Sequence, residues 1–293
     1  MVSFAHSLRQ SCREFKPDVV HLHSSFAGAL GRLALISLRD RPVVLYTPHC
    51  FAFMMQSGLL AGFAYRIIER ILQRFTAAII CVSQHELTSA IEAGLKASKL
   101  HLIYNGVTPS DPFSAPRKGE RPTFAFIGRL DHQKGVDIFL SAISSLQIDC
   151  EVLIIGAMVK GGPASSTEVR RVKFLGWKSP EEIDTLLQEV DAVVVPSRWE
   201  GFAMVPLEAM RRGIPVIASN ATSLPEIVTD GINGLLFRSG DAVDLARALR
   251  AATKAALERM RGNAHATVKQ RFHLSETLKK TRRLYNTSHH SAE

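Results

Sequence analysis

The chain has 293 residues, a length that suits two domains better than one, and its 46% hydrophobic content is enough to build two buried cores. Four cysteines are scattered without paired spacing, which excludes a disulfide framework and the common zinc patterns. The formal net charge of +9 favours an anionic partner. Because no aromatic-rich motif accompanies the basic residues, we expect no nucleic-acid partner.

Apolar, β-rich runs alternate with helical patterns, which predicts an α/β fold with parallel sheets covered by helices. A first helix is expected at 4–15. Four prolines in the stretch 108–122 predict an interdomain linker at 110–122, which divides 1–109 from 123–268. A terminal helix is expected at 269–287, and residues 288–293 are expected to be disordered. The predicted strands are 18–23, 43–47, 77–82, 100–104, 123–127, 152–155, 172–175, 192–195, 216–218 and 234–237.

One histidine in the first half is placed as a site residue would be. His49 follows the apolar strand 43–47, with Pro48 between them, and precedes a phenylalanine-rich loop, so we take it as a candidate. His21 and His23 lie at another strand end, without a specific chemical pattern around them. We interpret them as polar residues of that strand end.

The segment 43–65 has no formally charged residue and is long enough to span a bilayer. Pro48, His49 and Gln56 interrupt it, and its first part is β-branched, so we exclude a transmembrane helix. The N-terminus shows no signal peptide, since it reaches Arg9 without an apolar stretch. We therefore expect a cytoplasmic protein.

Arg66, Arg70 and Arg74 repeat every four residues and should share one helix face. Two interpretations stay open. The arginines form the solvated face of a core helix, or they contact anionic lipid head groups or a lipid-diphosphate acceptor, as a peripheral protein on the inner face of the plasma membrane would. The apolar residues on the other side of this helix are Ile67, Ile68, Ile71, Leu72 and Phe75.

In the second half, Gly128 ends a predicted strand, and Arg129 and Lys134 follow on one loop before a helix that starts near Val136. Two cations beside the free N–H groups of a helix start are suited to a diphosphate. Trp177 and Lys178 follow another strand end, where the residues by themselves indicate an ordinary capping turn with a half-buried tryptophan.

A second loop follows the strand 192–195. It contains Glu200 and Gly201, and a helix is predicted to begin near Pro206, with Glu208 on it. Loops that leave the carboxyl ends of parallel strands are where α/β folds bind ligands, and Gly201 would allow close approach of the backbone.

The second loop resembles the signature of retaining glycosyltransferases of the GT-B fold, family four (glycosyl transferases group 1). The matching pattern is Pro-Ser, two residues, Glu-Gly-Phe, a second Glu at position 208, and Gly-Ile-Pro-Val at 213–216. Gly-Arg-Leu, three residues, then Lys-Gly at 128–135 is similar to the family's donor-diphosphate motif. Ala203 stands where the family most often has glycine.

The resemblance implies two Rossmann-like parallel-sheet domains that face each other across a cleft, with an incomplete N-terminal, acceptor-side domain and a terminal helix that crosses back to it. It implies catalytic roles for His49 and Glu200, with the histidine contacting the donor sugar. It implies that Glu208 accepts hydrogen bonds from the ribose. It also implies that Trp177 or Lys178 contacts the nucleobase, as the alternative to the capping turn. The residues that it places around the nucleotide sugar are Gly128, Arg129, Lys134, Gly201, Phe202, Ala203, Met204, Val205 and Glu208.

The implied function is retaining transfer of a hexose from a nucleoside-diphosphate sugar, typically a UDP-sugar, to a cell-surface polysaccharide or a lipid-linked glycan. No Asp-x-Asp motif occurs, so we expect transfer without a metal and without any other cofactor. Two alternatives are a truncated, inactive protein that only binds nucleotide sugar, and a sugar-nucleotide epimerase of the same fold.

Overall fold

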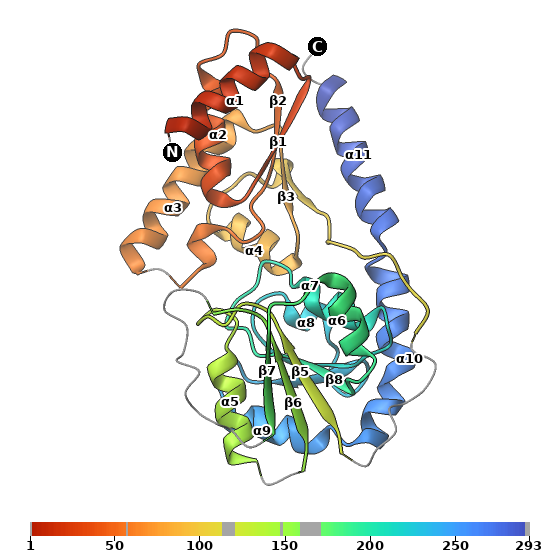
Figure 1. The fold of residues 1–293 in the computed structure, drawn as a ribbon. Coiled ribbons are helices and arrows are strands. Elements are labelled where there is room, and N and C mark those ends of the chain that lie inside the picture. Colours follow the sequence, from red (N-terminus) through yellow and green to blue (C-terminus); the bar gives the residue numbers. More distant parts are fainter. Residues whose placement is uncertain (1, 57, 113–120, 147–148, 159–170, 291–293) are drawn as a thin grey trace. The chain divides into compact units, whose positions relative to one another are not determined.

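The computed structural model describes residues 2–56, 58–112, 121–146, 149–158 and 171–290. The chain divides into two compact units, one made of Met1–Asn105 with Ser275–Glu293 and the other of Gly106–Leu274. Each unit contains its own parallel sheet (Figure 1). No helix in the described part of the chain combines the length and apolar character needed to cross a membrane.

The first unit has a four-stranded sheet whose strands follow their order in the sequence, all parallel. Short apolar, β-branched runs form these strands, and helices connect them, as parallel pairing requires. The strands are β1 (Val19–His23), β2 (Val43–Thr47), β3 (Ala78–Cys81) and β4 (Leu100–Leu102). The helices are α1 (Val2–Phe15), α2 (Ser25–Ile36), α3 (Leu59–Leu72), α4 (Gln84–Glu92) and α11 (Leu274–His290), with 3-10 turns at Ala52–Met54, Gln73–Phe75 and Ala97–Lys99.

Alternate residues of these strands pack into two different cores. Leu22 and Tyr46 lie in a core with Cys12 of α1 and Leu35 of α2. Leu45, Ala78 and Ile80 point to the other face, where Leu284 of α11 covers them. The last helix of the chain is therefore part of the first unit.

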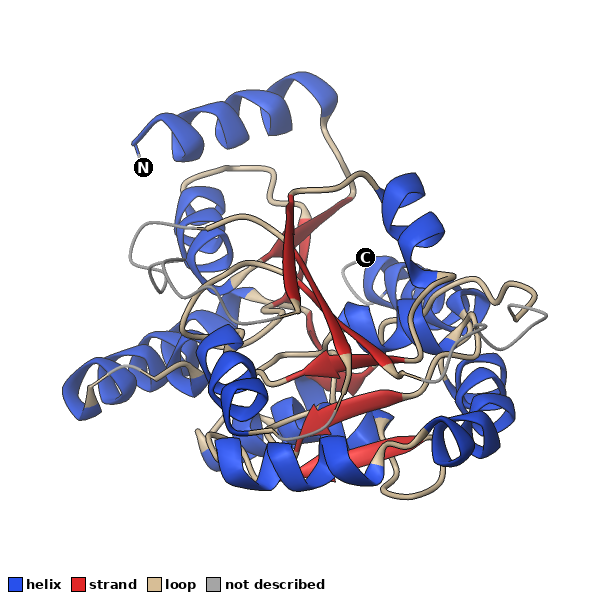
Figure 2. Cartoon of the chain, turned by 60° about the horizontal axis from the view of Figure 1, so that its bottom comes forward, coloured by secondary structure: helices blue, strands red, loops and turns tan. Residues whose placement is uncertain are grey.

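The second unit has a six-stranded parallel sheet in the order β10-β9-β8-β5-β6-β7. Its strands are β5 (Thr123–Ile127), β6 (Glu151–Ile155), β7 (Val172–Gly176), β8 (Ala192–Val195), β9 (Val216–Ser219) and β10 (Gly234–Phe237). Figure 2 draws both units with helices in blue and strands in red. The helices of the second unit are α5 (Val136–Ser145), α6 (Pro180–Leu187), α7 (Met204–Met210), α8 (Leu224–Ile227), α9 (Ala242–Ala251) and α10 (Lys254–Arg271). Phe124 and Phe126 of β5 pack in its main core with Phe139 of α5 and Leu245 of α9.

All ten predicted strands are present, with ends that differ by no more than two residues. The predicted disorder of 288–293 is wrong for 288–290, because α11 continues to His290, and no glycine or proline stops it earlier. Residues 291–293 and 113–120, the latter within the predicted linker, lie outside the described residues.

Candidate functional site

The strand order of the second unit reverses between β5 and β8, its two central strands. From β5 the chain moves outward through β6 to β7, and from β8 it moves the other way through β9 to β10. In open parallel sheets, ligands bind outside the carboxyl ends of the strands at such a switch point. The loops that leave these two ends are 128–135 and 196–203, the two that carry most of the predicted site residues.

The two loops touch at the level of the backbone. A Cβ atom on Gly135 would lie 2.1 Å from the carbonyl oxygen of Pro196, and Gly135 has a φ of 70°. A Cβ on Gly156, at the end of the neighbouring strand β6, would lie 1.8 Å from the carbonyl oxygen of Gly128. Only glycine permits these approaches, so the glycines fix how the loops pack.

Arg198 holds the second loop against the first. Its backbone N–H donates to the carbonyl of Gln133 at 2.8 Å, and its guanidinium donates to the carbonyl of His132 at 2.7 Å. The same guanidinium binds both oxygens of Asp137, in the first turn of α5, at 2.9 and 2.6 Å. The hydrogen bonds from Arg198 lower the pKa of Asp137 and keep this pair charged.

Lys134 and Glu200 meet across the two loops. The Lys134 Nζ donates to Glu200 Oε1 at 2.6 Å, and the Ser197 hydroxyl donates to the same oxygen at 2.7 Å. The backbone N–H of Glu200 donates to Thr222 Oγ1 at 2.9 Å. Glu200 is buried, and a buried carboxylate needs such partners. The structure thus brings two predicted site residues into direct contact.

Arg129 lies on the same loop as Lys134 but stays 58% exposed. Its guanidinium donates to Gln133 Oε1 at 2.9 Å and lies 3.1 Å from Asp131. Asp131 also accepts a hydrogen bond from the backbone N–H of Lys134, at 2.9 Å. Arg129 is therefore oriented by its own loop and still accessible to an anion.

The remaining predicted residues of the second unit lie around the start of α7, which begins at Met204, two residues before the predicted position. Gly201, Phe202 and Ala203 are buried, and the Phe202 ring packs 5.5 Å from that of Phe272. Phe202 and Ala203 are therefore packed inside the unit, whereas Met204 and Val205 are half-buried. Glu208 is exposed and makes no hydrogen bond or ion pair within the described residues.

His49 lies in the first unit, just beyond β2, with a φ of 56° that only a few residue types adopt without strain. Its Nε2 lies 2.8 Å from Nδ1 of His23, and the two rings stack. His21 is next to them and bonds to Tyr285 on α11 and to Thr47. Burial lowers the pKa of all three histidines, and the neighbouring rings lower that of His21 further, to about 4.

Sequence reasoning missed several partners of the predicted residues. Ser197 and Thr222 bind Glu200, yet neither was predicted; the signal for Ser197 was its place after a strand, three residues before the glutamate.

Trp177 is 73% exposed, and Lys178 pairs with Glu182 at 2.9 Å in the first turn of α6. No three His, Cys, Asp or Glu side chains group as metal ligands within the described ranges.

Two family models together match most of the chain. The model described as Glycosyl transferases group 1 matches residues 107–267, and the model described as Glycosyltransferase Family 4 matches residues 1–111. The first covers the whole switch-point region of the second unit.

Similar curated proteins include an uncharacterized 41.2 kDa protein in the cps region of Klebsiella pneumoniae, 37% identical over 78% of this chain and 67% of its own length. The phosphatidyl-myo-inositol mannosyltransferase of Propionibacterium freudenreichii is 34% identical over 79% of this chain. An Escherichia coli protein named UDP-Gal:alpha-D-GlcNAc-diphosphoundecaprenol alpha-1,3-galactosyltransferase is 28% identical over 95%. The matches span only 60% and 78% of these last two relatives.

Among solved structures, HepE of Anabaena in complex with UDP has a TM-score of 0.80 at 24% identity, over 97% of this chain and 82% of that one. The sucrose-phosphate synthase of Thermosynechococcus elongatus has a TM-score of 0.81 at 21% identity, over 97% and 77%. These likenesses establish the fold, which is that of GT-B glycosyltransferases.

Proposed function

Because the chain belongs to the glycosyl transferases group 1, we propose that it moves a hexose from a nucleoside-diphosphate sugar to a cell-surface polysaccharide or a lipid-linked glycan. The transfer retains the anomeric configuration and needs no metal. The observation that carries this proposal is the contact between Lys134 and Glu200 at the switch point, with the exposed Arg129 beside it.

The donor diphosphate would bind at the loop 128–135. Arg129 supplies an accessible cation, and Lys134 can turn from Glu200 toward the phosphates, because its side chain is still 23% exposed. Negative charge builds up on the diphosphate as the sugar leaves, and two positioned cations would stabilise it. This is the role that a metal ion plays in other transferases.

The sugar and ribose would be held from the other loop and from α7. Glu200 accepts hydrogen bonds from Lys134 and Ser197 through Oε1 alone, which leaves Oε2 for a sugar hydroxyl. Glu208 is exposed on α7 and would accept from the ribose hydroxyls. His49 is proposed as a catalytic residue of the first unit.

The names of relatives support the donor and acceptor classes. The Escherichia coli relative is named for a UDP-linked donor and a diphosphoundecaprenol-linked acceptor, and the Klebsiella pneumoniae relative for its cps region. We therefore propose UDP as the nucleotide and a lipid-linked glycan as the first acceptor to test.

The test is a transfer assay with UDP-, GDP- and ADP-hexoses and lipid-linked glycan acceptors, in the presence of a chelator. We expect turnover of a UDP-hexose that persists with the chelator, and loss of turnover in Glu200→Ala and His49→Ala. Turnover only with added divalent metal would contradict the metal-free mechanism. Binding of nucleotide without turnover of any donor would contradict transfer itself.

A further inference from the structure

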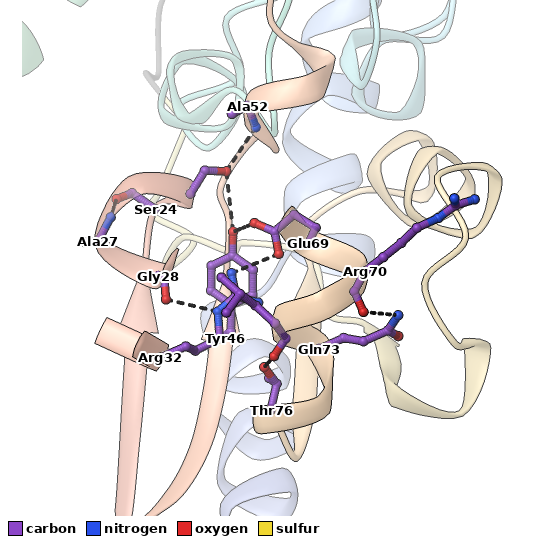
Figure 3. A network of polar contacts seen from close by, with 12 residues as sticks. Ser24, Ala27, Gly28, Arg32, Tyr46, Ala52, Glu69, Arg70, Gln73 and Thr76 are labelled. Atoms are coloured by element: carbon purple, nitrogen blue, oxygen red, sulfur yellow. Dashed lines mark hydrogen bonds and ion pairs between the residues drawn. The ribbon is translucent and has the colours of Figure 1, made fainter. Parts of the chain in front are cut away.

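Helix α3 buries a charged residue in the first unit and exposes apolar residues to solvent. Glu69 is buried, with its carboxylate bound by Arg32 at 2.8 Å and by the Tyr46 hydroxyl at 3.0 Å. Figure 3 shows Glu69 directed toward Tyr46, while Arg70 of the same helix points away. On the outside, Leu59 is 94% exposed, Leu60 88% and Phe63 63%. An ordinary surface helix has the reverse arrangement.

The exposed residues form one continuous surface. Positions 59, 63, 67 and 71 follow each other at four-residue intervals, which places them along one side of a helix. Arg66 and Arg70 keep the same interval beside that stripe, and Arg74 lies in the 3-10 turn Gln73–Phe75 that directly follows α3. We call this surface the outer face of α3; it consists of Leu59, Leu60, Phe63, Arg66, Ile67, Arg70, Ile71 and Arg74, all exposed.

The exposed charges of the segment 55–76 are all positive. Between residues 55 and 76 the only acidic residue is Glu69, and its charge is neutralised inside the unit by Arg32. Arg70 donates to the carbonyl of Ala93 at 2.6 Å, and the Arg66 guanidinium lies 5.9 Å from the centre of the Phe53 ring. Both arginines keep their positive charge. The outer face therefore combines apolar side chains with three cations and no acid.

We propose that the outer face of α3 binds the surface of an anionic lipid bilayer. A helix of 14 residues is about 21 Å long, too short to cross a hydrocarbon core of about 30 Å. It can lie in the interface, with leucine and phenylalanine side chains below the head groups and arginines at the level of the lipid phosphates. This proposal rests on the proposed function and adds where the enzyme works, because a lipid-linked acceptor is found at such a surface.

The test is sedimentation of the full chain with vesicles of phosphatidylcholine alone and of phosphatidylcholine with phosphatidylglycerol. We expect binding to the anionic vesicles that weakens with added salt. Leu60→Ser and Phe63→Ser should each reduce it roughly tenfold or more, and Arg66→Gln and Arg74→Gln roughly fivefold each. Matched controls are Val243→Ser on α9 and Leu278→Ser on α11, also exposed apolar residues, which should leave binding unchanged.

Two results would overturn the proposal: equal binding to neutral and anionic vesicles, and no binding to either. If binding is absent and light scattering detects a dimer that Leu60→Ser and Phe63→Ser dissociate, the face binds a second copy of the chain instead. UDP binding, measured by thermal shift on the same samples, separates this failure from failure of the proposed function.

Discussion

Lys134 Nζ lies 2.6 Å from Glu200 Oε1, so a cation proposed to bind the donor diphosphate is neutralised by an acid from the neighbouring loop. The two residues are 66 positions apart and meet because β5 and β8 are adjacent strands. A diphosphate must therefore compete with Glu200 for this lysine.

This competition predicts an effect of Glu200→Gln. Removing the carboxylate frees Lys134, so UDP should bind roughly three- to tenfold more tightly, while transfer is lost. Calorimetric titration with UDP measures the first effect and a transfer assay the second. The matched control is Glu151→Gln, which breaks the Lys173–Glu151 pair at 3.5 Å at the opposite, amino end of the sheet. Weaker UDP binding in Glu200→Gln would contradict the competition.

Gly135 and Gly240 provide a second, paired prediction. Both have positive φ, 70° and 80°, but a Cβ on Gly135 would meet Pro196 at 2.1 Å, whereas nothing lies within 4 Å at Gly240. Gly240→Ala should cost about 1 kcal/mol of stability from backbone strain alone. Gly135→Ala should cost about 3 kcal/mol or more, because the two loops must separate, and should abolish UDP binding. Urea unfolding measures both losses of stability. Equal losses in the two variants would show that the contact between Gly135 and Pro196 does not stabilise the second unit.

The buried pair of Arg32 and Glu69 predicts strong coupling. Glu69→Gln should destabilise the first unit by about 3–5 kcal/mol, because the Arg32 charge, already with one unpartnered nitrogen, would stay buried alone. The double change Arg32→Met with Glu69→Leu should recover much of this loss. Urea unfolding of the wild type, Arg32→Met, Glu69→Leu and the variant with both changes forms a double-mutant cycle. Additive losses in that cycle would contradict the pairing.

The histidines of the first unit predict a dependence of stability on pH. Burial first, and then His23 and His49, lower the pKa of His21 to about 4, whereas an unfolded histidine titrates near 6.5. Between these values the unfolded chain binds more protons, so stability is complete above about pH 6.5 and falls as the pH drops toward 4. We expect a loss of about 2 kcal/mol from His21, after allowance for its partial exposure.

Hydrogen exchange of the β1 and β2 amides at several pH values in this window measures that loss within the first unit. His21→Gln should flatten the profile, whereas His85→Gln, on the exposed side of α4, should leave it unchanged. Greater protection at pH 4.5 than near pH 7 would contradict the predicted sign.

The strands could be predicted because each is a local apolar run, and the loops of the site because they follow such runs. The pairing of Lys134 with Glu200 could not, because it depends on β8 lying beside β5, which no local pattern specifies. For α3, the sequence placed Ile67, Ile68, Ile71, Leu72 and Phe75 on the side opposite the arginines, yet only Leu72 is buried. Burial of Glu69 instead depends on Arg32, 37 residues earlier.

Calorimetric titration of UDP into the wild-type chain and Arg129→Ala, both with a chelator present, tests whether the loop 128–135 binds the donor diphosphate. The exposed Arg129 should give the diphosphate a charge-assisted hydrogen bond, so its removal should weaken UDP binding roughly tenfold to a hundredfold. The matched control Arg238→Ala, an arginine that is 74% exposed beyond β10, should bind UDP as the wild type does. Equal affinity of the wild type and Arg129→Ala would contradict a diphosphate site at the carboxyl ends of β5 and β8.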